Sequence, residues 1–555
     1  MAVLQLDMKS GFDLLQMEFV YFCFKKYGFS DKTINIFKNI YGSALALSVV
    51  NGKSSKLITD SRETLRQGGS GSMGIFNVGV NPVIQLLESK LEGVTLYSQP
   101  VLGPVPKNEE RLPPITHTEK TMNYVDDLNP IVTKVEEFKT VDSCLVLFEK
   151  ASGCEFHRDP NSQKCKVTPF GKWKQWLTQD NVPLPFLLVT ETLEILGVKI
   201  FESYSDTRRD FGSKMVEKIE TISNIWKGGR FYDFLLRPHV VNTYLFSNVW
   251  HKGSVIELLC EHSDKIQSLG NKYVFRGCYF SPERVVNYLD KSDGGLQINN
   301  IRSKSKAIFI KNFLNDVGSN VYTTAVFRKY IQSKEVFPAP VKPDYLNDIL
   351  INLIREVIKE ISVFSTKNIY KVLLKKQFNI NENFKLKIEL EDNTLENVMR
   401  FTDSKMISVS VRSFVWKFAH NILYSEINEA KTKLTIPCCD SCGEVDIDYK
   451  HCFFVCEKVY AIASKFLEVL KIFDPAYSFE EVIKLKSKEE FPHVNWFIAY
   501  TLYYIYDNRK RCSLNHYITF LQTEYEVLKF SKKKNIEEEI RVSNMMIELL
   551  QNDSY

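Results

Sequence analysis

"TMNYVDDLNP", residues 121–130, places two acidic side chains, Asp126 and Asp127, directly beside each other. The residues around the pair have the pattern of two strands joined by a short turn. Adjacent carboxylates repel each other unless a positive charge lies close to both. The stretch therefore predicts a hairpin whose tip either binds a divalent metal ion or is a solvated polar turn. Because Pro130 lacks an N–H group, we expect the second strand to lie at a sheet edge or to be bulged there.

A third acidic residue, Asp7, ends the apolar stretch "AVLQL" (residues 2–6). The following "SGFDLL" predicts the start of a helix. Carboxylates at the ends of buried strands are common functional positions. The alternative is that Asp7 and Asp13 only favour a helix N-terminus. Phe12 is expected to project near Asp7, or else to be part of the helix core.

Between these acidic segments lies a glycine-rich turn, "TLRQGGSGSMGIFN" (residues 64–77), that leads into a predicted helix. Glycines let a backbone approach a ligand closely, and a helix N-terminus favours anionic groups. Arg66, Gln67 and Gly68 open the turn. The segment predicts a site for an anionic ligand, and a plain flexible loop is the alternative.

The order of these three segments resembles the palm of reverse transcriptases from non-LTR (LINE-type) retrotransposons. That family has Asp-x-x-x-Ala-Phe-Asp at the strand end, where this chain has Asp7 to Asp13. Its Arg-Gln-Gly motif corresponds to Arg66–Gly68, and its Tyr-Ala-Asp-Asp motif to residues 124–127. Further similar segments are "SGCEFHRDPNSQKCK" (152–166), "LGVKI" (196–200), "WKGGRF" (226–231), "NTYLFSNVW" (242–250) and "DGGLQINNIR" (293–302).

The chain departs from this family pattern at two places. The family's Cys-Pro after Arg-Gln-Gly is Gly69-Ser70 here, which loosens the turn. The basic fingers segment that precedes the first aspartate in the family, and any endonuclease domain, are not found before Asp7. We therefore expect that an N-terminal portion is missing.

The resemblance implies an α+β fold, the right-hand palm of a polymerase, with an antiparallel sheet and helices. Its expected parts are the palm with partial fingers (1–204), a helical thumb-like region (205–335), a connector (336–435), a zinc element (436–460) and a helical C-terminal region (461–555).

The chemistry implied by the resemblance is RNA-directed DNA synthesis with two Mg²⁺ ions. Asp7 and Asp126 would bridge the metals, and Asp127 would be the third acid. The Phe12 ring would lie under the sugar of the incoming deoxynucleotide and exclude a 2′-hydroxyl. Arg66, Gln67 and Gly68 would position the template base and the nucleotide, and Lys164 would act as a general acid for the leaving pyrophosphate. The implied partners are an RNA template, a DNA primer and deoxynucleoside triphosphates.

A cysteine-rich stretch, "PCCDSCGEVDIDYKHCFFVC" (residues 437–456), predicts a second metal site. Cys439, Cys442, His451 and Cys456 offer three thiolates and one imidazole, a set typical of structural Zn²⁺. Cys438 and Cys452 are neighbours that could replace a ligand, and a cluster of buried thiols is the alternative to a metal site.

Bulk composition is compatible with this interpretation but does not demand it. The chain has 555 residues, 44% of them hydrophobic, and a formal net charge of +5, which neither requires nor excludes nucleic acid. It has no signal-peptide pattern and no apolar run of about 18 residues, so we expect no membrane span. The twelve cysteines then indicate a reducing intracellular compartment, and the resemblance implies the nucleus.

Two other functions compete with reverse transcription. The first is a catalytically inactive remnant of a retroelement that binds nucleic acid, which the missing fingers favour and the three aspartates oppose. The second is an RNA-dependent RNA polymerase. Phe12 disfavours it, and so does Val125, because those enzymes usually carry glycine there.

Overall fold

The computed structural model describes the chain except residues 43–44, 52, 61–64, 66–70, 98–115, 160, 162–163, 228–232, 277, 279–281, 283, 320–347, 362, 380–394, 424, 487–490, 531–536 and 552–555. The chain divides into two compact units. The first consists of Met1–Phe211 with Phe313–Arg355, and the second of Gly212–Asn312 with Glu356–Tyr555. Each is described by itself.

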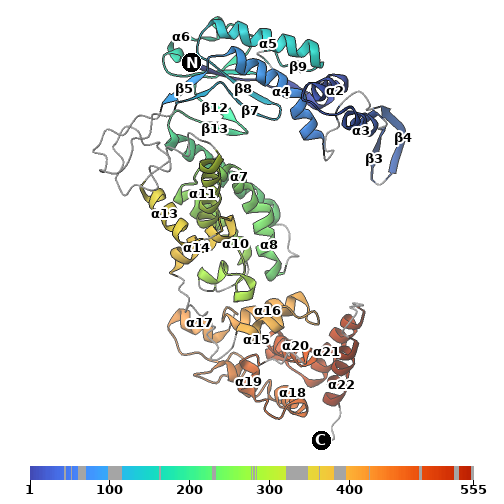
Figure 1. Cartoon of the computed structure of the whole chain (residues 1–555). Helices are drawn as coiled ribbons and strands as arrows, with labels where there is room; N and C mark the ends of the chain where they lie inside the picture. Colours follow the sequence, from blue (N-terminus) through green and yellow to red (C-terminus); the bar gives the residue numbers. More distant parts are fainter. Residues whose placement is uncertain are drawn as a thin grey trace. The chain divides into compact units, whose positions relative to one another are not determined.

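The first unit is built on a five-stranded sheet with the order β11-β10-β1-β8-β7. Figure 1 labels β7 and β8 of this sheet. All neighbours pair antiparallel except β10 and β11. The strands are β1 (Ala2–Gln5), β7 (Thr121–Tyr124), β8 (Asp127–Val132), β10 (Lys166–Pro169) and β11 (Leu187–Leu188).

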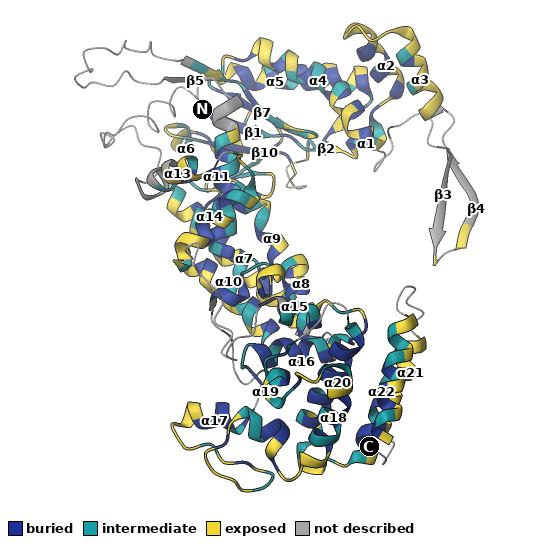
Figure 2. Ribbon diagram, turned by 60° about the horizontal axis from the view of Figure 1, so that its bottom comes forward, coloured by how far each residue is buried: buried dark blue, intermediate teal, exposed yellow. Residues whose placement is uncertain are grey.

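β1 is apolar because both of its faces are covered. Ala2 and Leu4 pack into the main core of the unit, whereas Val3 packs with Ile131 and Leu193 in a smaller cluster. Successive side chains of a strand point to opposite faces, which explains the two environments. The main core is supplied by α2 (Met17–Lys26), α4 (Ser72–Lys90) and α5 (Glu136–Ser152), whose buried faces are dark blue in Figure 2.

Pro130 lies in an inner strand whose register with both neighbours is unchanged around it, so the expectation of an edge strand or a bulge there is wrong. β8 runs between β1 and β7. It pairs with β1 at Ala2–Val132 and Val3–Ile131, and again at the Leu6–Leu128 bridge. The proline stands in the gap between these pairs, where the sheet needs no N–H donor from it.

Short elements surround this sheet. They are β2 (Met8–Lys9), α1 (Gly11–Leu14), α3 (Asp31–Gly42), β3 (Leu45–Val50), β4 (Lys53–Asp60), β5 (Val94–Tyr97), β6 (Thr116–Glu119), β9 (Glu155–Phe156), α6 (Trp173–Trp176), β12 (Leu193–Ile195) and β13 (Val198–Ile200).

The described part of the second unit consists mainly of helices joined by turns and loops. Helices α7 (Tyr204–Lys227), α11 (Ile301–Ser319) and α13 (Asp348–Glu360) have residues in both units. The helices that lie wholly in the second unit before residue 380 are α8 (Arg237–Val240), α9 (Ser247–Trp250), α10 (Cys260–Val274) and α14 (Thr366–Phe378). The helices after residue 394 are α15 (Leu395–Thr402), α16 (Val409–Ala419), α17 (Glu426–Lys433), α18 (Tyr460–Phe473), α19 (Phe479–Ile483), α20 (Pro492–Asn508), α21 (Leu514–Phe530) and α22 (Glu537–Gln551).

α20 is the centre of the C-terminal core. Every residue from His493 to Leu502 is buried, so this helix is enclosed on all sides rather than amphipathic. Despite that apolar character, none of the helices in the described part of the chain has the length and hydropathy of a membrane span.

The α+β class predicted from the sequence is confirmed: a small, mainly antiparallel sheet is followed by a long helical region. The domain boundaries expected at residues 204, 335, 435 and 460 remain predictions.

Candidate functional site

The two adjacent aspartates lie at the tip of a tight hairpin, as the sequence predicted. Tyr124 pairs with Asp127, which leaves Val125 and Asp126 as a two-residue turn. Val125 has a φ of 58°, in the left-handed region. A β-branched side chain rarely adopts that conformation, and such strain is typical of functional sites.

Asp7 comes to the same end of the sheet through the pairing of β1 with β8. Leu6 exchanges backbone hydrogen bonds with Leu128, at 2.9 and 3.4 Å. The next position along this antiparallel register sets Asp7 opposite Asp127. Residues opposite each other in such a ladder project from the same face of the sheet.

The three carboxylates influence one another electrostatically. Burial raises the pKa of Asp127, and the charges of Asp126 and then Asp7 raise it further. In the part of the chain that the structure describes, the oxygens of these three carboxylates do not all lie within 4.8 Å of one another. The ligand atoms of the cysteine–histidine cluster described below do. The site is therefore an open acidic group, whose like charges a dication would relieve.

Two cationic or basic side chains lie beside Asp7. Lys164 Nζ is 3.8 Å and His157 Nε2 is 3.5 Å from Asp7 Oδ2. The backbone N–H of His157 also donates to the backbone carbonyl of Asp7 at 3.1 Å. Sequence reasoning did not single out His157, although it lies in the family-like segment that also contains Lys164.

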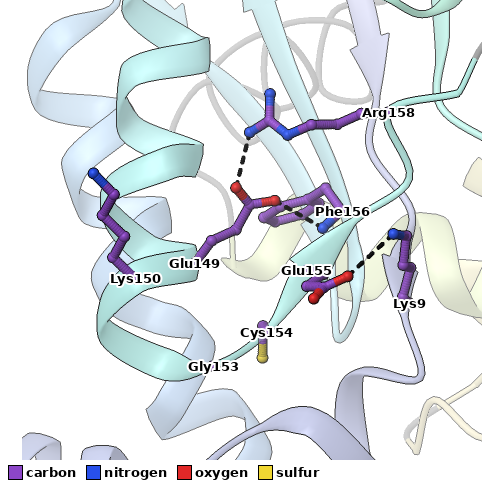
Figure 3. Close-up of a pocket in the computed structure, with 8 residues that line it drawn as sticks. All are labelled: Lys9, Glu149, Lys150, Gly153, Cys154, Glu155, Phe156 and Arg158. Atoms are coloured by element: carbon purple, nitrogen blue, oxygen red, sulfur yellow. Dashed lines mark hydrogen bonds and ion pairs between the residues drawn. The ribbon is translucent and has the colours of Figure 1, made fainter.

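Residues on both sides of His157 line a pocket of about 510 Å³. Contacts among these lining residues hold the segment in place (Figure 3). Glu149 accepts the Phe156 N–H at 2.9 Å and pairs with Arg158 at 3.0 Å, while Lys9 pairs with Glu155 at 3.1 Å. Since these charges are paired with one another, we assign this pocket a structural role: it holds β9 against β2, next to Asp7.

Phe12 stacks on Phe76 of α4, with ring centroids 4.3 Å apart and an angle of 13° between the planes. Its side chain is half-buried, and its carbonyl accepts the Leu65 N–H at 3.2 Å. The expected nucleotide-binding residues Arg66, Gln67 and Gly68 lie outside the described residues.

An open groove of about 650 Å³ borders the hairpin on the side of α4. The turn contributes Tyr124 and Val125, and α4 contributes Met73 and Asn77. Tyr124 is 60% exposed, so much of this aromatic residue is open to solvent at the hairpin.

The second candidate site is a compact cluster of Cys439, Cys442, His451 and Cys456, whose ligand atoms all lie within 4.8 Å of one another. Cys439 Sγ is 3.9 Å from Cys456 Sγ, and Cys442 Sγ is 3.3 Å from His451 Nε2. Three sulfurs and one ring nitrogen in this arrangement fit tetrahedral Zn²⁺.

The chain forms this cluster with two local devices. Gly443, with a φ of 83°, closes the turn after Cys442 by donating to the Cys439 carbonyl at 2.8 Å. The turn of His451–Val455 is a π-helix, closed by the Cys456 N–H on the His451 carbonyl at 2.9 Å. In an α-helix, residues five apart would point about 140° away from each other. The wider π turn brings the His451 and Cys456 side chains together.

The neighbouring cysteines are placed apart from the cluster. Cys438 is exposed and directs its thiol to the Gly443 carbonyl at 3.5 Å, and buried Cys452 is not among the clustered ligands. Burial raises the pKa of Cys452 to about 12. Burial also opposes ionisation of Cys439, but N–H groups of Ser441 and Cys442 and the His451 side chain lower its pKa to about 7. Thiolate character at Cys439 suits a metal ligand.

A largely buried ion pair supports the turn between Cys439 and Cys442. Arg509 pairs with Glu426 of α17, and their side chains are only 15% and 10% exposed. Glu426 also accepts the Asp440 N–H at 3.3 Å, and Arg509 Nε donates to Ser441 Oγ at 3.4 Å. These bonds connect the turn with α17 and with the end of α20.

Comparison with known proteins shows a distant relationship to a transposon protein. No family model matches the chain. Over 308 residues, or 55% of its length, the chain is 21% identical to the transposon TX1 uncharacterized 149 kDa protein of Xenopus laevis. The match spans 22% of that protein. The chain is thus distantly similar to part of a transposon protein.

Proposed function

We propose that the chain is the reverse transcriptase part of a non-LTR retrotransposon protein and adds deoxynucleotides to a primer 3′-end on an RNA template. The observation that carries the proposal is the placement of Asp7 opposite Asp127, beside the Val125-Asp126 turn. The distant similarity to a transposon protein supports a retroelement origin.

In this proposal the three carboxylates hold the metal ions of the reaction. Asp7 and Asp126 would be bridging ligands, and Asp127 would complete the acidic group. The raised pKa of Asp127 fits this role, because closely placed carboxylates gain most from a dication. Two Mg²⁺ ions, when bound, would stabilise the attacking 3′-oxygen and the leaving pyrophosphate.

Other side chains orient the acids and the substrate. His157 and Lys164 both contact the same carboxylate oxygen of Asp7, and these contacts would restrict rotation of the Asp7 side chain. Lys164 is also the candidate general acid, since its side chain is 58% exposed and can turn toward a leaving pyrophosphate. The Phe12 ring, supported by Phe76, would exclude a ribose 2′-hydroxyl.

The Cys3His cluster would bind one structural Zn²⁺. Its four ligands leave no open position for substrate chemistry. Its connection to Glu426 and Arg509 supports a bracing role in the C-terminal core.

The test is primer extension on an RNA template with deoxynucleoside triphosphates and Mg²⁺. Asp7→Asn and Asp126→Asn should each lower the rate by roughly 100-fold or more, because each removes a metal ligand. Asp13→Asn is the matched control, since Asp13 is exposed and lies near Asp7 in sequence. It should keep activity near that of the unmodified chain.

Equal activity of Asp126→Asn and the unmodified chain would contradict the proposal. If the chain binds primer–template but never extends it, even with Mn²⁺ in place of Mg²⁺, the inactive retroelement remnant becomes the better description.

A further inference from the structure

A second cavity, far in sequence from the three aspartates, lies in the second unit. It has a volume of about 500 Å³, within the usual range for small-molecule pockets. Its walls are seven residues of the segment from Tyr288 to Asn299, Lys304 of α11 and one face of α14.

Helix α14 gives this cavity two parallel rows of side chains. Thr366, Tyr370 and Leu374 recur at every fourth residue, and so do Lys367, Lys371 and Lys375. Residues four apart lie on the same side of a helix, about 6 Å apart along its axis. The three lysines thus form a row of positive charge about 12 Å long beside an aromatic and aliphatic wall.

The charges of the cavity are unbalanced. Four lysines line it against two acids, Asp290 and Asp293. Asp290 is already paired with Lys371 at 3.3 Å. Lys367 and Lys375 form no ion pair with the residues that the structure describes, and both are exposed at the edge of the cavity that they line.

Lys304 adds a partly buried cation. Its ammonium donates to Asn299 Oδ1 at 2.8 Å and lies 4.9 Å from the centre of the Trp250 ring. Burial lowers the pKa of this lysine. Lys304 has no carboxylate partner in the described residues. An anion bound in the cavity would therefore stabilise its charged form.

Aromatic side chains line the cavity on both sides, Tyr288 opposite α14 and Tyr370 on α14 itself. Tyr288 is buried, and its ring centroid lies 5.2 Å from that of Phe378 with the planes tilted by 35°. Tyr370 is fixed because its hydroxyl accepts the Asn300 N–H at 3.0 Å. Rigid aromatic and aliphatic walls beside a row of cations are the usual means by which proteins bind unpaired nucleotides.

We propose that this cavity binds one nucleotide of a single-stranded nucleic acid, with its base against Tyr370 and Leu374 and its backbone along the lysine row. A free nucleotide shares the phosphate and base chemistry. The length of the lysine row favours a strand, because one compact phosphate cannot reach Lys367 and Lys375 together. The inference does not depend on polymerase activity.

The experiment measures binding of a fluorescent single-stranded decanucleotide as a function of salt, without divalent cations. Lys367→Gln/Lys375→Gln should reduce the slope of log K against log salt by about 1.4, since each phosphate contact on a single strand contributes about 0.7. At 0.15 M salt this corresponds to roughly tenfold weaker binding. The matched control is Lys272→Gln/Lys471→Gln, two exposed lysines of the same unit that do not line the cavity.

A second arm locates the base. A decanucleotide with a photoreactive uracil should cross-link to the peptide that contains Tyr370, and excess unlabelled decanucleotide should compete. Equal salt slopes for the two double variants, or no cross-link to α14, would overturn the proposal. Competition by a nucleoside triphosphate but not by the decanucleotide would assign the cavity to a free nucleotide and overturn the strand assignment.

Discussion

Asp7 and Asp127 face each other across the antiparallel pairing of β1 and β8, one position beyond the Leu6–Leu128 bridge. The two side chains therefore share a face of the sheet. A one-residue shift in this register would turn the Asp7 carboxylate to the other face. The register of a buried strand thus determines whether the acidic site exists.

The raised pKa of Asp127 predicts a pH-dependent cost in stability. Below its ordinary value of 3.8 the carboxyl is protonated in both the folded and the unfolded chain, and the cost is absent. As pH rises through 3.8 toward the raised folded pKa, the unfolded chain loses its proton first and stability falls. Asp127→Asn should therefore raise Tm at pH 7 in EDTA, and the gain should disappear at pH 3.

Thermal unfolding followed by circular dichroism measures this difference, with Asp13→Asn as the exposed control. A gain of the same size at pH 3 and pH 7 would show that ionisation of Asp127 is not its cause.

Phe12→Val should change sugar selection if the ring lies under the incoming nucleotide. Ribonucleotide incorporation should rise relative to deoxynucleotide incorporation, because the clash with the 2′-hydroxyl is removed. Since Phe12 is half-buried and stacked on Phe76, the change should also cost about 1–3 kcal/mol of stability. The assay compares the two incorporation rates in single-nucleotide extension on one primer–template.

Phe12→Leu is the control for the loss of stacking, because it keeps most of the side-chain volume. If both incorporation rates fall together in Phe12→Val, with an unchanged ratio, Phe12 serves only as packing for α4.

The Cys3His cluster predicts about one zinc per chain by metal analysis. His451→Ala should lose most of that zinc, because it removes one of four ligands. Cys438→Ala should retain it, because the Cys438 thiol points to the Gly443 carbonyl instead. Full zinc content in His451→Ala, or loss in Cys438→Ala, would require a different ligand set.

Glu426 is expected to support both stability and the metal site. Glu426→Ala leaves the Arg509 guanidinium without its carboxylate in a largely buried position, which should cost about 3 kcal/mol. It also removes the acceptor of the Asp440 N–H. Denaturant unfolding and zinc affinity should both weaken. The exposed Lys450–Glu480 pair is the comparison, and Glu480→Ala should leave both measurements nearly unchanged.

Local features of the acidic site could be predicted from the sequence, because they depend on residues close together in the chain. The Tyr124–Asp127 turn, the strand that ends at Asp7 and the Cys439–Cys442 spacing are of this kind. The edge position or bulge expected at Pro130 was wrong, because a proline restricts its own backbone but does not reveal which strands pair beside it.

Contacts between distant segments were decided only by the tertiary structure. The sequence by itself determined which residues carry acid, thiol and aromatic groups, and in what order. The pairing of β1 with β8 set Asp7 opposite Asp127, and the pairing of β2 with β9 brought His157 to Asp7. At the zinc-type cluster, a π turn selected His451 and Cys456 over Cys452. The physical reason is that register and turn geometry arise from the burial of whole strands and helices, which no short motif encodes.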